Sequence, residues 1–179
     1  MKLILKLGVF LLLGFSSAAA IAAPGAGFRP QPGDSVEQQT YLRGRALAMQ
    51  LVRDARPTLG FADRRLAARV VNELAGARFL ASTDRQSRQL CSTRRYSLFV
   101  NAARPAVIHV CDVVRVHARR PDADAISRLA QGFVHEAVHL AGNMDECAAM
   151  DFELAVMRRT IGIRSQGSLI SYGARCQGQ

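Results

Sequence analysis

The segment that most constrains the fold is a helical apolar repeat that carries the pattern H-E-x-x-H. Apolar residues recur at helical spacing from Ala125 to Val138, after acidic residues typical of a helix start at Pro121 to Asp124. Gly142 follows the repeat as a stop signal. Positions i and i+4 of an α-helix share one face, so His135 and His139 can direct their imidazoles at one metal ion. Glu136 lies one step round the same helix.

A zinc site of this kind uses three protein ligands and keeps a fourth position for water. The third ligand must come from beyond Gly142, where two neighbouring carboxylates occur. Glu146 is the preferred ligand because a strong helical pattern follows the glycine, and Asp145 is the alternative. Glu136 is the candidate general base.

The residues around this third ligand predict a second helix directly after the turn. Asn143 is expected to cap it, with Glu146 completing an N-x-x-E capping box, and the helix should run to about Arg159. Asp151 is a candidate to hold a ligand histidine in place. Glu153 is expected on the solvated face.

The N-terminus has the pattern of a secretory signal peptide. Lys2 and Lys6 precede an apolar run from Leu7 to Phe15, and cleavage is expected after Ala22. The predicted organisation is a signal peptide over 1–22, a flexible lead over 23–33 and a single domain over 34–179. No later stretch approaches 18 apolar residues, so no stable membrane span is expected after cleavage. The expected location is periplasmic or secreted.

The chain has four cysteines, an even number that predicts two disulfides in an exported protein. Three pairings are possible, and Cys91–Cys111 and Cys147–Cys176 are favoured. The two strand-like runs at 96–100 and 106–110 fit a hairpin, which would bring Cys91 close to Cys111. Cys176 could tie the C-terminal tail to the helix that carries Cys147.

The remaining patterns predict an α+β fold that is mainly helical with a small β-hairpin. One helix is expected from Asp34 or Ser35 to about Ala55, and another from near Asp63 to Gly76, with Phe79 and Leu80 as a possible continuation. Residues 82–89 are polar and are expected to form a loop. Residues 113–120 fit either a short helix or an extension of the sheet.

The net charge of +10 raises the question of nucleic-acid binding. Apart from Lys2 and Lys6, every strong cation is an arginine; the arginines are dispersed, and the chain has no tryptophan. A nucleic-acid surface would show a basic cluster with stacking aromatics. No nucleic-acid partner is therefore expected.

Residues 129–154 resemble zincin metallopeptidases. The segment Glu146-x-x-Ala149-x-Asp151 is similar to the ligand helix of the gluzincin group, whereas the spacing from His139 through Gly142 to Asp145 resembles metzincin-like enzymes such as snapalysin. The resemblance implies one Zn²⁺ per chain, a peptide or protein substrate, and hydrolysis by a metal-activated water with Glu136 as general base. It also implies an edge strand beside the active-site helix, for which the hairpin is the candidate. Candidate oxyanion donors are His109, His117, Arg115 and Tyr172.

Two other functions fit the same sequence. One is a non-catalytic, disulfide-stabilised envelope protein with a metal-binding or vestigial H-E-x-x-H site. The other is an arginine-rich module that binds anionic polymers. The intact set of His135, Glu136 and His139 favours the peptidase over the first of these, and the absence of a basic cluster with stacking aromatics from the sequence disfavours the second.

Overall fold

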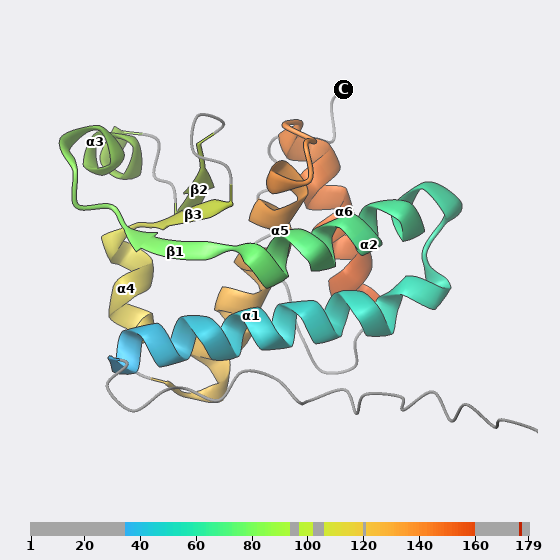
Figure 1. Ribbon diagram of the computed structural model, residues 1–179, viewed down its shortest axis with the longest axis horizontal. Helices are drawn as coiled ribbons and strands as arrows, with labels where there is room; N and C mark the ends of the chain where they lie inside the picture. The colour runs from blue at the N-terminus through green and yellow to red at the C-terminus, as the bar shows by residue number, and fades with distance from the viewer. Residues whose placement is uncertain (1–34, 94–96, 102–105, 120, 160–175, 177–179) are drawn as a thin grey trace, which may run out of the picture.

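The structure is a computed structural model that describes residues 35–93, 97–101, 106–119, 121–159 and 176, and it is mainly helical with one small sheet (Figure 1). This is the expected α+β class. The helices are α1 (Val36–Ala55), α2 (Phe61–Gly76), α3 (Arg85–Thr93), α4 (Asp112–Ala118), α5 (Ala123–Leu140) and α6 (Glu146–Arg159), with a 3₁₀ turn over Arg56–Thr58. The strands are β1 (Arg78–Ala81), β2 (Leu98–Val100) and β3 (Val107–Val110). The expected signal peptide and lead lie outside the described residues.

The sheet contains the predicted hairpin and one strand that was not predicted. Strands β2 and β3 pair antiparallel, while β1 pairs parallel with the other side of β3, which gives the order β1-β3-β2. The helix before β1 ends at Gly76, and Ala77 is already extended. Phe79 therefore does not continue the helix, and in β1 it packs on the rings of Tyr41 and Phe133.

Helix α3 replaces the loop that the polar composition of 82–89 suggested. Asp84 caps this helix, because its carboxylate accepts hydrogen bonds from the backbone nitrogen of Ser87 at 2.8 Å and from the Ser87 hydroxyl at 2.7 Å. The helix is so polar that it has too few apolar residues to form the stripe by which the longer helices were predicted. The signal that could have found it is the Asp84-x-x-Ser87 cap.

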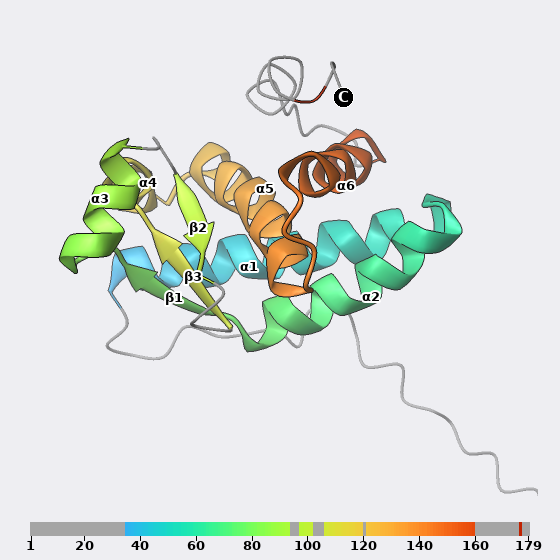
Figure 2. The same cartoon turned by 90° about the horizontal axis from the view of Figure 1, so that it is seen from above.

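Helix α5 lies at the centre of the fold, between the sheet and α6 (Figure 2), and also packs on α1. Two glycines allow close approaches here. A Cβ placed on Gly44 of α1 would lie 2.9 Å from the Cβ of Leu129, and one placed on Gly132 of α5 would lie 2.6 Å from Leu98 Cδ1. Because these two glycines have no side chain, α1 and β2 can pack directly against the helix that carries H-E-x-x-H.

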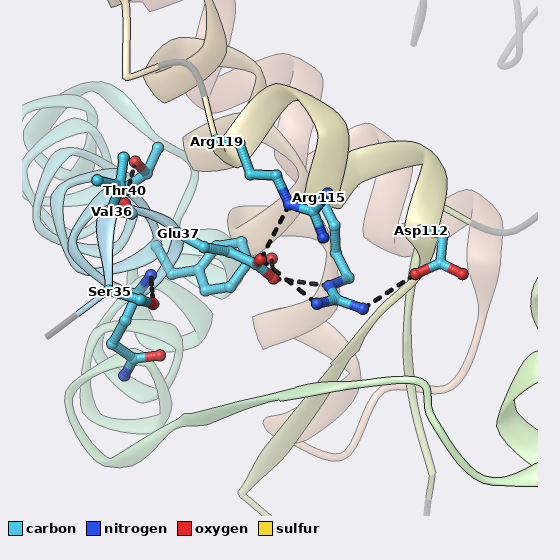
Figure 3. A network of polar contacts seen from close by, with 9 residues as sticks. Ser35, Val36, Glu37, Thr40, Asp112, Arg115 and Arg119 are labelled. Carbon is cyan, nitrogen blue, oxygen red and sulfur yellow. Dashed lines mark hydrogen bonds and ion pairs between the residues drawn. The ribbon is translucent and has the colours of Figure 1, made fainter.

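Of the segment 113–120, which the sequence left open, residues 113–118 lie in helix α4, and polar contacts tie α4 to α1 (Figure 3). Glu37 accepts hydrogen bonds from Arg115 Nε and from the Tyr41 hydroxyl, both at 2.7 Å. Arg119 lies 3.5 Å from the same carboxylate. Burial by itself raises the pKa of Glu37, but these donors outweigh it and lower the pKa below the usual value. The network fixes the start of α1 against α4.

Both predicted disulfides are present. Cys91 of α3 is bonded to Cys111, directly after β3, and Cys147 of α6 is bonded to Cys176. Disulfides of this kind form in oxidising compartments. Among the helices that the structure describes, none is long and apolar enough to cross a membrane.

Candidate metal centre

Helix α5, which carries H-E-x-x-H, begins and ends where the sequence predicts. Asp122 caps α5, its side chain accepting from the backbone nitrogen of Ala125 at 2.7 Å. At the other end Gly142 has φ +91°, and the backbone nitrogens of Gly142 and Asn143 donate to the carbonyls of His139 and Val138. This is the Schellman arrangement, in which glycine reverses the chain without steric cost. The reversal returns the chain as α6, packed against α5.

The start of α6 differs from the expected capping box. The helix begins at Glu146, and its cap is Asp145, whose carboxylate accepts from the backbone nitrogen of Ala148 at 2.9 Å. Asn143 instead accepts from the backbone nitrogen of Asp145 at 3.0 Å, which shapes the turn before the helix. Asp145 thus has a structural role at the helix terminus. Glu146, one residue later, is left to face α5.

The side chains of His135, His139 and Glu146 converge, with one ligand atom from each lying within 4.8 Å of the others. The Glu146 carboxylate lies 3.2 Å from Nε2 of His135 and 3.7 Å from Nε2 of His139. The centroids of the two imidazole rings are 5.0 Å apart. Two imidazole nitrogens and a carboxylate oxygen at these separations could hold a metal ion.

Each histidine also has a partner on its other nitrogen. Nδ1 of His139 lies 2.7 Å from the carbonyl oxygen of Asn143. A carbonyl can only accept, so this Nδ1 carries the proton and, in the neutral ring, Nε2 keeps the lone pair. Nδ1 of His135 lies 3.2 Å from the carboxylate of Glu153. Both rings are therefore oriented with Nε2 toward Glu146. Metal-ligating histidines usually have such a hydrogen-bond partner on the nitrogen that does not bind the metal.

Glu153 is buried, whereas the sequence predicted it on a solvated face. Its side chain is only 4% exposed and also accepts a hydrogen bond from Gln131 Nε2 at 2.6 Å. Asp151, the residue expected to support a histidine, is exposed. Glu153 lies seven residues after Glu146, which on a helix is about 20° from the same direction, whereas Asp151 lies about 140° away. That seven-residue spacing is the signal that could have identified Glu153.

Glu136 lies beside the cluster and is buried, 7% exposed. Burial raises the pKa of its carboxyl to about 7, and the charges of Glu146 and Glu153 act in the same direction. His135 and a backbone hydrogen bond from Val100 partly offset this rise. The contact with Val100 places the Glu136 carboxyl where the edge strand β2 meets α5.

The pKa of His135 is also shifted. Burial alone would lower it, but hydrogen bonds to Glu146 and Glu153 and the charge of Glu136 raise it to about 10. The cause is a concentration of three carboxyl groups around one imidazole. Such a concentration of negative charge suits a cation.

The structure gives different positions to the candidate oxyanion donors. His109 of β3 is buried and stacks on Phe99, with ring centroids 4.6 Å apart. Arg115 pairs with Glu37 at the α1–α4 contact, and His117 is exposed on α4. Tyr172 lies outside the described residues.

No family model matches the chain, and neither the curated proteins nor the solved structures contain a significant match to it.

Proposed function

We propose that the protein is an exported zinc-dependent metallopeptidase. The observation that carries the proposal is the convergence of both histidine Nε2 atoms on one carboxylate, with both Nδ1 atoms already engaged. His135, His139 and Glu146 would bind the ion. Two imidazoles and one carboxylate form a donor set that suits Zn²⁺ and leaves a coordination position free.

When bound, zinc would supply a Lewis acid that polarises a carbonyl and makes water acidic near neutral pH. The remaining work falls to the side chains of the protein. Glu136 would accept the proton of the attacking water and pass it to the leaving amine. Its neighbour His135 is a ligand, so the base is held beside the reacting centre by their common helix.

The substrate we propose is a peptide in extended form. Among the strands that the structure describes, β2 pairs with β3 on one side only, and it packs against α5 through the contact of Leu98 with Gly132. An edge strand can pair with an added peptide strand through its main-chain groups. Val100 contacts Glu136, so a peptide along this edge would pass next to the general base.

The two disulfides, together with the expected signal peptide over 1–22, support an extracytoplasmic location. The protein would act in the periplasm or outside the cell.

The test is a comparison of purified wild type with Glu136→Gln and His135→Ala. We expect about one zinc per chain in wild type and Glu136→Gln by elemental analysis, and loss of zinc in His135→Ala. A digest of a peptide library, read by mass spectrometry, should show cleavage by wild type, and Glu136→Gln should be slower by at least about 10²-fold.

Equal cleavage by wild type and Glu136→Gln would refute the peptidase. Stoichiometric zinc without cleavage by either protein would support the alternative, a non-catalytic metal-binding envelope protein. That alternative shares the disulfides and the cluster but gives Glu136 no chemical role.

A further inference from the structure

Glu153 is a buried carboxylate whose position the proposed hydrolysis does not by itself explain. Burying a charged group costs several kcal/mol unless hydrogen bonds compensate it. Here one oxygen lies 3.2 Å from Nδ1 of His135, and the other accepts from Gln131 Nε2 at 2.6 Å. Both partners belong to α5, while Glu153 belongs to α6.

The two helices present these groups in matching rows. On α5, Gln131, His135 and His139 follow one another at four-residue spacing, and on α6 Glu146 and Glu153 are two turns apart. The contacts therefore alternate across the helix interface. In order along the interface they run Gln131–Glu153, Glu153–His135, His135–Glu146 and Glu146–His139.

We infer that Gln131 and Glu153 form a positioning pair that orients His135 for metal binding, an inference that rests on the proposed function. Glu153 accepts the Nδ1 proton and so leaves Nε2 as the nitrogen that faces Glu146. Gln131 holds the second oxygen of Glu153, which prevents the carboxylate from rotating away from the imidazole. Neither residue belongs to the group His135, His139 and Glu146, whose ligand atoms converge.

The two ligand histidines are thus oriented by different means. His139 is held by the backbone carbonyl of Asn143, which no side-chain substitution removes. His135 depends on a side chain, and removal of that side chain changes one ligand only. A carboxylate partner also makes an imidazole a stronger ligand than a neutral carbonyl does.

Asp151 provides the matched control. It is a carboxylate on α6, two residues from Glu153, and is the residue that the gluzincin-like pattern would assign to this support. Because it is exposed, loss of its charge changes the long-range field but no contact in the cluster.

The experiment measures the zinc dissociation constant of the full exported chain by competition with a chromophoric chelator. The variants are Glu153→Gln, Gln131→Met and Asp151→Asn. We expect the zinc dissociation constant to rise about 10–100-fold in Glu153→Gln and less than that, but measurably, in Gln131→Met. Asp151→Asn should stay within about twofold. Circular dichroism of the metal-free proteins checks that each variant folds.

A spectroscopic readout separates positioning from general loosening of the fold. In the Co²⁺-substituted proteins, Glu153→Gln should change the visible absorption of the ion, whereas Asp151→Asn should leave it unchanged. If Glu153→Gln does not fold, the zinc dissociation constant of Gln131→Met alone decides whether the pair positions His135.

The outcomes distinguish this inference from the proposed function. Wild type that fails to bind zinc at micromolar concentration overturns both. Wild type that binds zinc while Glu153→Gln and Gln131→Met bind it equally well overturns the positioning pair and leaves the zinc site standing. Equal weakening by Asp151→Asn would also overturn it, since the effect would then be one of charge and not of contact.

Discussion

Glu146 and Glu153 lie two turns apart on one face of α6, and their carboxylates approach opposite nitrogens of the same imidazole, each at 3.2 Å. The imidazole is that of His135. Glu153 is buried and Glu146 is half-exposed, so the first is suited to orient the ring and the second to share a metal ion with it. In the proposed metal site, this division of roles would separate the ligands from the residue that supports them.

The choice between Glu146 and Asp145 as third ligand gives the first prediction. Glu146→Ala should lose zinc, because the only carboxylate placed between the two Nε2 atoms in the described cluster is removed. Asp145→Ala should keep zinc and lose about 1 kcal/mol of unfolding free energy, the usual effect of removing a helix cap. Elemental analysis and urea unfolding measure the two effects. Loss of zinc in Asp145→Ala alone would reverse the assignment.

Metal removal gives the second prediction. A ligand that binds only the folded chain stabilises it, by about 2.7 kcal/mol when its free concentration is 100 times the dissociation constant. For a chain of this size that is a rise of about 5–10 °C in Tm. Zinc should therefore raise the Tm of chelator-treated protein, and His139→Ala should abolish the rise. An equal rise in His139→Ala would mean that the zinc binds elsewhere.

The close contact at Gly44 gives the third prediction. In Gly44→Ala the new methyl would meet the Cβ of Leu129 at 2.9 Å, and neither backbone can easily withdraw. Overpacking of about 1–3 kcal/mol should outweigh the gain of up to about 1 kcal/mol in helix propensity. Gly76→Ala is the control, because nothing lies within 4 Å of the added carbon. Urea unfolding should show a loss for Gly44→Ala and none for Gly76→Ala.

The Glu37 network gives the fourth prediction, which concerns pH. The pKa of Glu37 is lower in the folded protein than the ordinary value of 4.5, so its contribution to stability is present above that value. The contribution is lost as the pH falls through the folded pKa. Glu37→Gln should therefore be less stable than wild type by about 1–3 kcal/mol at pH 7.

The difference should shrink toward zero as both proteins are acidified below pH 4.5, measured by urea unfolding across the range. Glu73→Gln, on α2, controls for removal of a carboxylate in general. A difference that stays constant down to the acid end would contradict the ionic origin of the contact.

The sequence was most informative where signals are local. The caps at Ser35 and Asp122 and the stop at Gly142 each bond to backbone groups a few residues away, so they could be predicted from neighbouring residues. The hairpin brought Cys91 to Cys111 by the same kind of short-range reasoning.

The parts that could not be predicted depend on contacts distant in sequence or on surface position. Strand β1 exists because β3 offers it a parallel partner about 30 residues away, and nothing within four residues of sequence encodes that pairing. Helix α3 lacks an apolar stripe, since it packs little. Glu153 was misplaced because a glutamate is ordinarily solvated, and only the opposing row of Gln131 and His135 makes its burial favourable.

The turn at Gly142 has a consequence for folding kinetics. The contacts described among Gln131, His135, His139, Glu146 and Glu153 form within one helical hairpin, and the most distant partners, Gln131 and Glu153, are 22 positions apart in the chain. Closing so short a loop costs little entropy, so these contacts belong to the low-contact-order part of the fold. The Cys147–Cys176 bond spans 29 positions and needs an oxidant as well. These contacts can therefore form first, and the slower covalent step then acts on a hairpin that is already formed.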